Sequence, residues 1–225
     1  TQSRSSAASD VYKRQVWGDT VFVAERDNHR VQALSLPDFK TRGFIGADTL
    51  KVPYGLWLRE TAPDLLELLV TDSFMADFHT GQLPPREQMD QRVRRFEVDL
   101  QPDGGLQVRA AGSFGDTGQA GMLRMVESIA GDPAHDRLLI ADEDRRVGST
   151  FRDYTLEGRF RGASLPVFLA DAEGIALWDC DLDDGWWIAA DQLTPTLFRV
   201  YRRDTLAPVG TFTGKVVAVS YTHLT

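Results

Sequence analysis

Acidic side chains at three places in the chain could together hold a metal ion. Glu127 lies in the run VESIA, Glu143 follows LLIAD, and Asp171 and Glu173 open the run DAEGIALW. Each lies at the boundary of a short apolar run typical of a strand, and functional groups are commonly presented at strand ends and in loops. A hard cation such as Ca²⁺ takes about six to eight oxygen ligands, several of them carboxylates. The three segments could supply such a site, although Asp and Glu also favour turns for purely structural reasons.

Other catalytic chemistries find little support in the sequence. The histidines are His29 in a turn, His79 and His135 in polar loops, and His223 near the end, and no Gly-x-Ser-x-Gly motif occurs. The single cysteine, Cys180, lies beside a run of aspartates that would blunt its reactivity. No pair of histidine and cysteine residues has the spacing of zinc ligands. A serine or cysteine nucleophile and a zinc site are therefore not expected.

A second acidic string, DCDLDDG at residues 179–185, resembles the opening of an EF-hand calcium loop. Its glycine is one place late, and its twelfth position is Ala190 where an EF-hand has Glu. Strand-like runs flank the string, and Trp186 and Trp187 alternate across the second of them, so at least one should be in the core. A hairpin turn that exposes solvated charge is the better prediction.

Short strands are the elements that would position these groups. Nine runs rich in Val, Ile, Leu and aromatic residues are separated by turns of Gly, Asp, Asn and Pro, and no stretch keeps a helical period over three turns. The runs begin at Thr20, Arg30, Tyr54, Leu66, Arg92, Arg137, Gly174, Trp186 and Leu197. The polar segment LPPREQMDQ from Leu83 is expected to be a loop or short helix inserted between strands.

The strands belong to a repeat. Segments that end at Gly46, Gly115, Gly162 and Gly214 each contain a strand, an acidic turn and a second strand closing on Gly, Phe and Gly, at intervals of 69, 47 and 52 residues. A period near ~50 residues with about four strands per unit is typical of a β-propeller blade. We expect an all-β fold, a β-propeller of six-bladed type in the parent protein, present here as an incomplete ring of about four to five blades. A parallel β-helix fits less well because its repeats are shorter.

Composition limits the possible partners. The 225 residues are 42% hydrophobic and 26% charged, which is typical of a soluble globular chain. No run approaches the ~18 apolar residues of a membrane span. The 33 acidic residues outnumber the 25 basic ones, for a net charge of −8. This charge argues against a nucleic-acid partner and favours cations.

The two ends of the chain do not continue the pattern beside them. Residues 1–15 (TQSRSSAASDVYKRQ) and the final VSYTHLT look like translated linker sequence. We therefore expect a linker-like tail at 1–15, a β-propeller fragment at 16–214, and a truncated end with a second linker-like tail at 215–225.

Several of these runs together resemble the β-propeller phytases. The run DAEGIALW from Asp171, then GWWIAADQ ending at Gln192, then LFRVYRR, follows the order of strands in that family. The steps of 16 residues from Glu127 to Glu143 and 19 residues from Glu173 to Gln192 also match.

The resemblance continues toward the N-terminus and covers most of residues 16–214. PYGL around Tyr54 is similar to the family's Tyr-Gly strand, and AER with Arg26 is similar to the strand that offers a phosphate-binding arginine.

The resemblance implies a calcium-dependent phosphomonoester hydrolase similar to 3-phytase. Calcium would bind two neighbouring phosphates of inositol hexakisphosphate (phytate), and a metal-bridged water would attack one of them. The implied metal ligands are Tyr54, Glu127, Glu143, Asp171, Glu173 and Gln192. Of these, Glu127, Asp171 and Glu173 would be catalytic, and Arg26 would bind substrate phosphate. A monomer with a secreted or periplasmic location is also implied.

Physical chemistry agrees with these assignments. Clustered carboxylates repel one another unless a cation lies between them, and a bound divalent cation offers phosphate a positive surface. The planar fork of arginine donates two hydrogen bonds to phosphate at once.

The chain also departs from the family pattern. Where the family has a lysine after Val-Thr-Gly, this chain has Val70-Thr71-Asp72-Ser73, so an acid replaces an expected phosphate contact. Glu127 is followed by Ser128 where the family has glycine. The first and last blades of the family are absent, so the fragment can be inactive even if its parent is a phytase.

Two other functions stay open. The run DNHRVQ from Asp27 resembles the NHL repeat, whose propellers bind partners, and a fold does not by itself imply a function. A non-catalytic binding scaffold would not need Glu127, Glu143, Asp171 and Glu173 to converge. A gluconolactonase-like hydrolase would need a single-metal set with Asn ligands, which the sequence does not offer.

Overall fold

The fold consists of small antiparallel sheets. The computed structural model describes residues 14–180 and 184–214. Within these ranges the strands form four sheets of four strands, and each sheet takes four consecutive strands in up-and-down order. Sheets of this kind are the blades of a β-propeller. The predicted all-β fold is therefore confirmed, with four blades in the described part of the chain.

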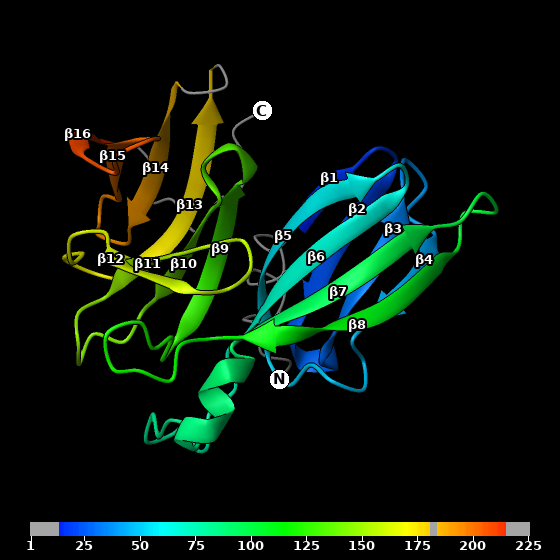
Figure 1. Ribbon diagram of the computed structural model, residues 1–225, viewed down its shortest axis with the longest axis horizontal. Helices are drawn as coiled ribbons and strands as arrows, with labels where there is room; N and C mark the ends of the chain where they lie inside the picture. The colour runs from blue at the N-terminus through cyan, green and yellow to red at the C-terminus, as the bar shows by residue number, and fades with distance from the viewer. Residues whose placement is uncertain (1–13, 181–183, 215–225) are drawn as a thin grey trace, which may run out of the picture. The chain divides into compact units, whose positions relative to one another are not determined.

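The strands follow the order of the sequence. Sheet 1 contains β1 (Arg14–Trp17), β2 (Thr20–Glu25), β3 (Arg30–Ser35) and β4 (Thr41–Ile45). Sheet 2 contains β5 (Pro53–Ala62), β6 (Leu65–Asp72), β7 (Val93–Leu100) and β8 (Leu106–Phe114), which are neighbouring arrows in Figure 1. Sheets 1 and 2 form one compact unit.

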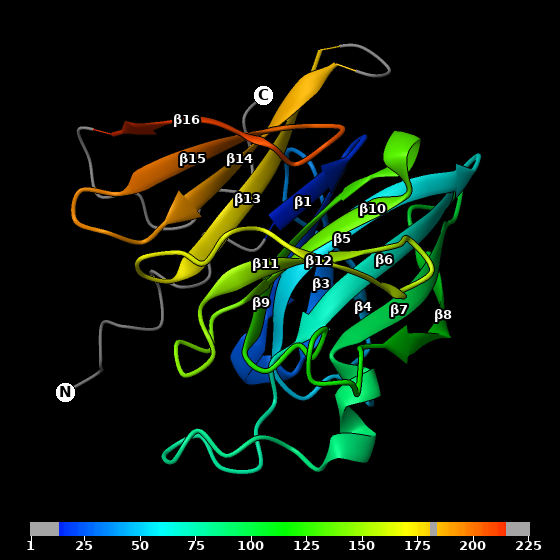
Figure 2. The same ribbon diagram turned by 60° about the vertical axis from the view of Figure 1, so that its left-hand side comes forward.

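The second unit contains the other two sheets. Sheet 3 contains β9 (Val126–Asp132), β10 (Arg137–Asp142), β11 (Thr150–Tyr154) and β12 (Phe160–Ser164). Sheet 4 contains β13 (Ala172–Asp179), β14 (Gly185–Asp191), β15 (Leu197–Arg202) and β16 (Pro208–Thr213), which Figure 2 shows side by side. The first strands of these two sheets, β9 and β13, are in contact.

Short 3-10 helices complete the described structure. They are η2 (Arg26–Asn28), η3 (Arg86–Gln91) and η4 (Pro133–His135). The helix η3 occupies the insert expected from Leu83, so that prediction is confirmed. No helix among residues 14–180 and 184–214 has the length and apolar character to cross a membrane.

Each unit has its own apolar core. In the first unit, Phe22, Val31, Leu68 and Val98 pack together from sheets 1 and 2. In the second unit, Trp187 packs with residues of sheets 3 and 4 and is fully buried. Each of the nine runs expected as strands lies on a strand and extends past it by no more than one residue at either end, because Val, Ile, Leu and aromatic side chains fit a pleated, buried surface.

The expected repeat is present, with one boundary displaced. Gly46, Gly115 and Gly214 directly follow the last strands of sheets 1, 2 and 4. Gly162 instead lies inside β12, where the pairing with β11 shifts register between Arg152 and Tyr154. Gly162 has a φ of 80°, a conformation that glycine adopts without strain at such an irregularity.

Three sheets share a buried aspartate that ties the first strand to the second. Asp72, Asp142 and Asp191 each end the second strand of a sheet and have no exposed surface. Each carboxylate accepts hydrogen bonds from backbone N–H groups just before the first strand, at 2.6 Å from Val52 to Asp72 and at 2.7 Å from Ala170 to Asp191. In each sheet the aspartate thereby holds the start of the first strand beside the end of the second strand.

An arginine on the third strand completes this connection. Arg94 lies 3.5 Å from Asp72, Arg152 3.0 Å from Asp142, and Arg199 2.5 Å from Asp191. Asp72, which the sequence indicated as a replacement for a phosphate contact, therefore has a structural role. Buried ionised groups require such partners, since an isolated buried charge is costly.

The expected tails lie mostly outside the described residues. Residues 1–13 and 215–225 are not described, so the linker origin of both ends stays a prediction. The last two residues of the expected N-terminal tail, Arg14 and Gln15, belong to β1 and pair with Val23 and Phe22 of β2.

Candidate metal centre

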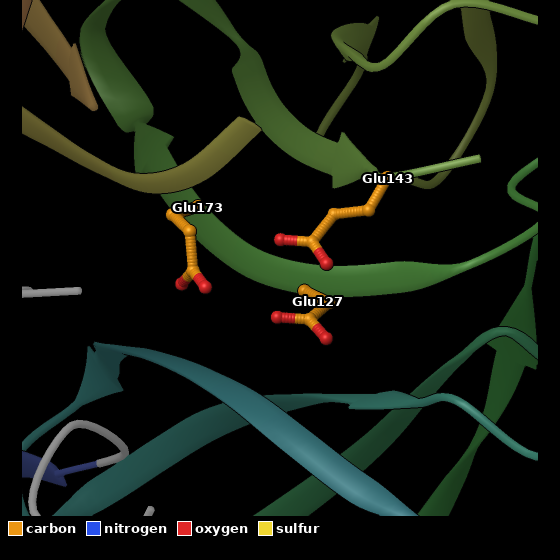
Figure 3. A group of neighbouring side chains, drawn as sticks. All are labelled: Glu127, Glu143 and Glu173. Carbon is orange, nitrogen blue, oxygen red and sulfur yellow. The ribbon is translucent and has the colours of Figure 1, made fainter. Parts of the chain in front are cut away.

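Three of the predicted metal ligands converge in the second unit. Glu127, Glu143 and Glu173 each offer a carboxylate oxygen, and these three oxygens all lie within 4.8 Å of one another. All three side chains are half-buried. Figure 3 shows the carboxyl groups turned toward a common space. The predicted convergence of these glutamates is therefore confirmed.

The backbone of sheet 3 fixes two of the glutamates. Glu127 is the second residue of β9, and Glu143 is the first residue after β10. Val126 pairs with Asp142 in the sheet register, and the Glu143 N–H donates to the Met125 carbonyl at 2.9 Å. These contacts place the two glutamates at the same end of the sheet.

Sheet 4 repeats this arrangement with Glu173 and Gln192. Glu173 is the second residue of β13, and Gln192 is the first residue after β14. Ala172 pairs with Asp191, and the Gln192 N–H donates to the Asp171 carbonyl at 2.9 Å. The side chains also meet, since Gln192 Nε2 donates to Glu173 Oε1 at 2.5 Å.

Asp171 lies beside the glutamates but makes an ion pair of its own. It directly precedes β13, and its carboxylate accepts two hydrogen bonds from the guanidinium of Arg145. Its negative charge still acts on Glu143. The structure thus brings five of the six predicted ligands, namely Glu127, Glu143, Asp171, Glu173 and Gln192, to one end of the second unit.

The sixth predicted ligand and the predicted phosphate-binding residue lie in the other unit. Tyr54 is half-buried on β5, at the position in its sheet that Glu127 and Glu173 occupy in theirs. Arg26 follows β2 directly, as Glu143 follows β10, and its guanidinium forms an ion pair with Asp27 at 2.9 Å. Their part in the site stays a prediction.

The electrostatics of the cluster are those of crowded carboxylates. Burial raises the pKa of Glu143 to about 11, helped by the negative charges of Glu127, Glu173 and Asp171 and by a hydrogen bond with Glu127. Without a cation, the cluster therefore holds a proton at neutral pH. A proton is the smallest cation that can relieve this repulsion.

The donor set suits a hard divalent cation. Glu143 Oε1 is buried, and no hydrogen-bond donor contacts it within residues 14–180 and 184–214. A buried polar atom without a partner is costly, and a cation would satisfy it. Carboxylate and amide oxygens are the ligands that Ca²⁺ prefers. The residues present therefore fit calcium.

The string that resembles an EF-hand does not join this centre. Asp179 pairs with Gly185 across the hairpin of β13 and β14, and Cys180 N–H donates to the Asp184 carbonyl at 3.3 Å. The Asp179 carboxylate forms an ion pair with Arg203 at 2.5 Å. The predicted hairpin is confirmed at these residues, while positions 181–183 lie outside the described part of the chain.

Arg145 is a residue of the site that the sequence did not indicate. It lies in the acidic-basic run DEDRR, where two arginines follow Asp144 and either could be an ordinary surface charge. Arg145 differs from Arg146 only because the loop after β10 brings it next to Asp171, the residue before β13. The spacing of 16 residues between Glu127 and Glu143 carries no information about this approach.

Comparison with known proteins identifies the fold but no family. No protein-family model matches the chain, and no curated protein sequence does. Among solved structures, the chain resembles one from a crystal structure of a nidogen/laminin complex, with a TM-score of 0.56 and 16% sequence identity. The match covers 92% of this chain and 65% of that chain. At this identity the likeness shows the β-propeller fold alone, and the resemblance to phytases stays a prediction.

Proposed function

We propose that this chain belongs to a calcium-dependent phosphomonoester hydrolase that releases phosphate from inositol hexakisphosphate. The observation that carries the proposal is the approach of the Glu127, Glu143 and Glu173 oxygens to within 4.8 Å of one another. A binding scaffold has no need for this arrangement, which costs free energy unless a cation is present.

Each acidic residue has a proposed role. Glu127, Glu143 and Glu173 hold the cation, and Gln192 orients the Glu173 carboxylate through the hydrogen bond at 2.5 Å. Asp171 adds a fourth carboxylate, and Glu127, Asp171 and Glu173 are the residues proposed to be catalytic. Bound calcium supplies positive charge for a phosphate group and lowers the pKa of water, so no histidine base is needed.

Two residues of the first unit enter the proposal through the resemblance to the phytases alone. Arg26 is suited to phosphate because its planar guanidinium can donate two hydrogen bonds at once. Tyr54, at the repeated position on β5, is assigned as an oxygen ligand by that resemblance. A site that depends on calcium agrees with a secreted or periplasmic parent protein, since calcium is abundant there.

The test is phosphate release from inositol hexakisphosphate at millimolar calcium. The substitution Glu173→Gln keeps the size of the side chain but removes a ligand charge, and it should abolish most of the release. The matched control is Glu97→Gln on β7, because Glu97 pairs with Arg109 outside the cluster. If the wild-type chain releases phosphate, undiminished release by Glu173→Gln would reject the proposal.

A non-catalytic binding scaffold is the second candidate. Its support is the likeness to a propeller from a nidogen/laminin complex and the similarity of DNHRVQ to the NHL repeat. In the structure this run forms η2 and the start of β3. A scaffold predicts no effect of calcium on the cluster, so calcium binding distinguishes the two candidates.

A further inference from the structure

Arg145 forms an exposed ion pair at the edge of the acidic cluster. It lies two residues after Glu143, in the loop between β10 and β11. Its Nε donates to Asp171 Oδ1 and its Nη2 to Asp171 Oδ2 at 2.5 Å. The Arg145 side chain is 65% exposed, against 20% for Asp171. The guanidinium thus reaches the cluster while keeping most of its surface in water.

The neighbouring Arg146 makes the same type of contact with a different result. Arg146 Nε lies 2.7 Å from Asp144 Oδ1, and its Nη2 lies 3.0 Å from Asp144 Oδ2. The Asp144 side chain is only 2% exposed and also accepts the Arg146 backbone N–H at 3.1 Å. Arg146 is therefore engaged by a carboxylate outside the cluster, whereas Arg145 is held by a predicted metal ligand.

The ion pair of Arg145 is one that a metal ion can break. Exposed ion pairs are weak because water screens them. A divalent cation carries twice the charge of a guanidinium, and a carboxylate that ligates it has less charge left for arginine. Binding of calcium to Asp171 would then free the donors of Arg145 beside the new positive charge.

We propose that Arg145 is a phosphate-binding residue of this site, held by Asp171 until Asp171 ligates a cation. The inference rests on the proposed function and adds a binding residue to it. A phosphate group that approaches the cation meets the planar fork of Arg145, whose paired N–H groups match the phosphate oxygens as they match the Asp171 carboxylate. Asp171 therefore keeps the guanidinium in place for a ligand of similar geometry.

The test compares calcium binding and phosphate binding by titration calorimetry. The chains are wild type, Arg145→Gln, Arg145→Lys and the control Arg146→Gln, and the probes are calcium alone and inorganic phosphate with calcium present, at about pH 6 where calcium phosphate stays dissolved. In Arg145→Gln, phosphate affinity should fall about tenfold or more, as expected for a lost charge-assisted hydrogen bond. Arg145→Lys should retain part of the affinity, and Arg146→Gln should retain all of it.

Calcium binding provides the second readout. Arg145→Gln should bind calcium at least as tightly as wild type, because no guanidinium competes for Asp171. Unchanged phosphate affinity in Arg145→Gln would overturn this inference and leave the proposed function intact. Weaker calcium binding by Arg145→Gln would also overturn it, because Arg145 would then be a positioning residue for Asp171. Failure of the wild-type chain to bind calcium would overturn the proposed function and this inference with it.

Discussion

Replacing Glu143 with glutamine should stabilise the metal-free chain. The raised pKa of Glu143 means that the folded chain holds a proton that the unfolded chain releases above the ordinary glutamate pKa of 4.5. The unfolding free energy then falls as pH rises from 4.5, by at most about 1.4 kcal/mol per pH unit. Glutamine is neutral at every pH and can still donate a hydrogen bond to Glu127.

The size of this change in unfolding free energy follows from the pH interval over which it accumulates. Between pH 4.5 and 7 the full effect would reach about 3 kcal/mol, and water that reaches the half-buried Glu143 reduces it toward about 1 kcal/mol. The difference in unfolding free energy between Glu143→Gln and wild type should therefore be small at pH 5 and should grow toward pH 7, to about 1–3 kcal/mol in all. The contribution is present below the unfolded pKa and is lost as pH rises, as expected for an acid whose folded pKa is raised.

The assay is urea unfolding in the presence of a chelator at pH 5, 6 and 7. Wild type, Glu143→Gln and the control Glu97→Gln are compared, because other titrating groups cancel in the differences. Glu97→Gln should show no growing advantage over wild type. A Glu143→Gln chain that is less stable than wild type at all three pH values would refute the reasoning about the cluster, as would parallel curves.

Two further substitutions test the framework that positions the site. Asp142→Ala leaves Arg152 without its buried partner and should lower the unfolding free energy by about 3–5 kcal/mol in urea, whereas Asp204→Ala on the surface should change it little. An Asp142→Ala chain as stable as wild type would contradict the structural role of this aspartate. Gly121→Ala would place a Cβ 2.5 Å from Cγ of Phe160 and should cost about 1–3 kcal/mol, while Gly210→Ala meets no atom within 4 Å. Equal thermal midpoints for these two alanine variants would show that the contact at Gly121 is not tight.

Most of the strands could be predicted from local sequence patterns. Runs such as TVFVAE and RLLIAD combine β-branched and leucine side chains with turn residues at both ends, and these are the properties that form buried strands. The displaced boundary at Gly162 could not be predicted, because it depends on a register shift between β11 and β12. Irregular pairing of this kind is set by the partner strand and leaves little trace in a single run.

The site residues that could be predicted from the sequence are those at positions that recur from blade to blade. Glu127 and Glu173 occupy one repeated position and Glu143 and Gln192 another, so the blade pattern brings them to equivalent sheet ends. Asp72 looked like a lost phosphate contact because the sequence does not show that its carboxylate accepts the Val52 N–H. The pairing of two residues 26 positions apart, Arg145 and Asp171, depends on loop conformation and could not be predicted.

Thermal unfolding with and without calcium tests the central claim most directly. A ligand at about a hundred times its dissociation constant stabilises the folded state by about 2.7 kcal/mol, or about 5–10 °C for a domain of this size. The account predicts a rise of this order for the wild-type chain and for Glu97→Gln, and its loss in Glu143→Gln and Glu173→Gln. Equal midpoints for the wild-type chain in calcium and in chelator would contradict a cation site formed by Glu127, Glu143 and Glu173.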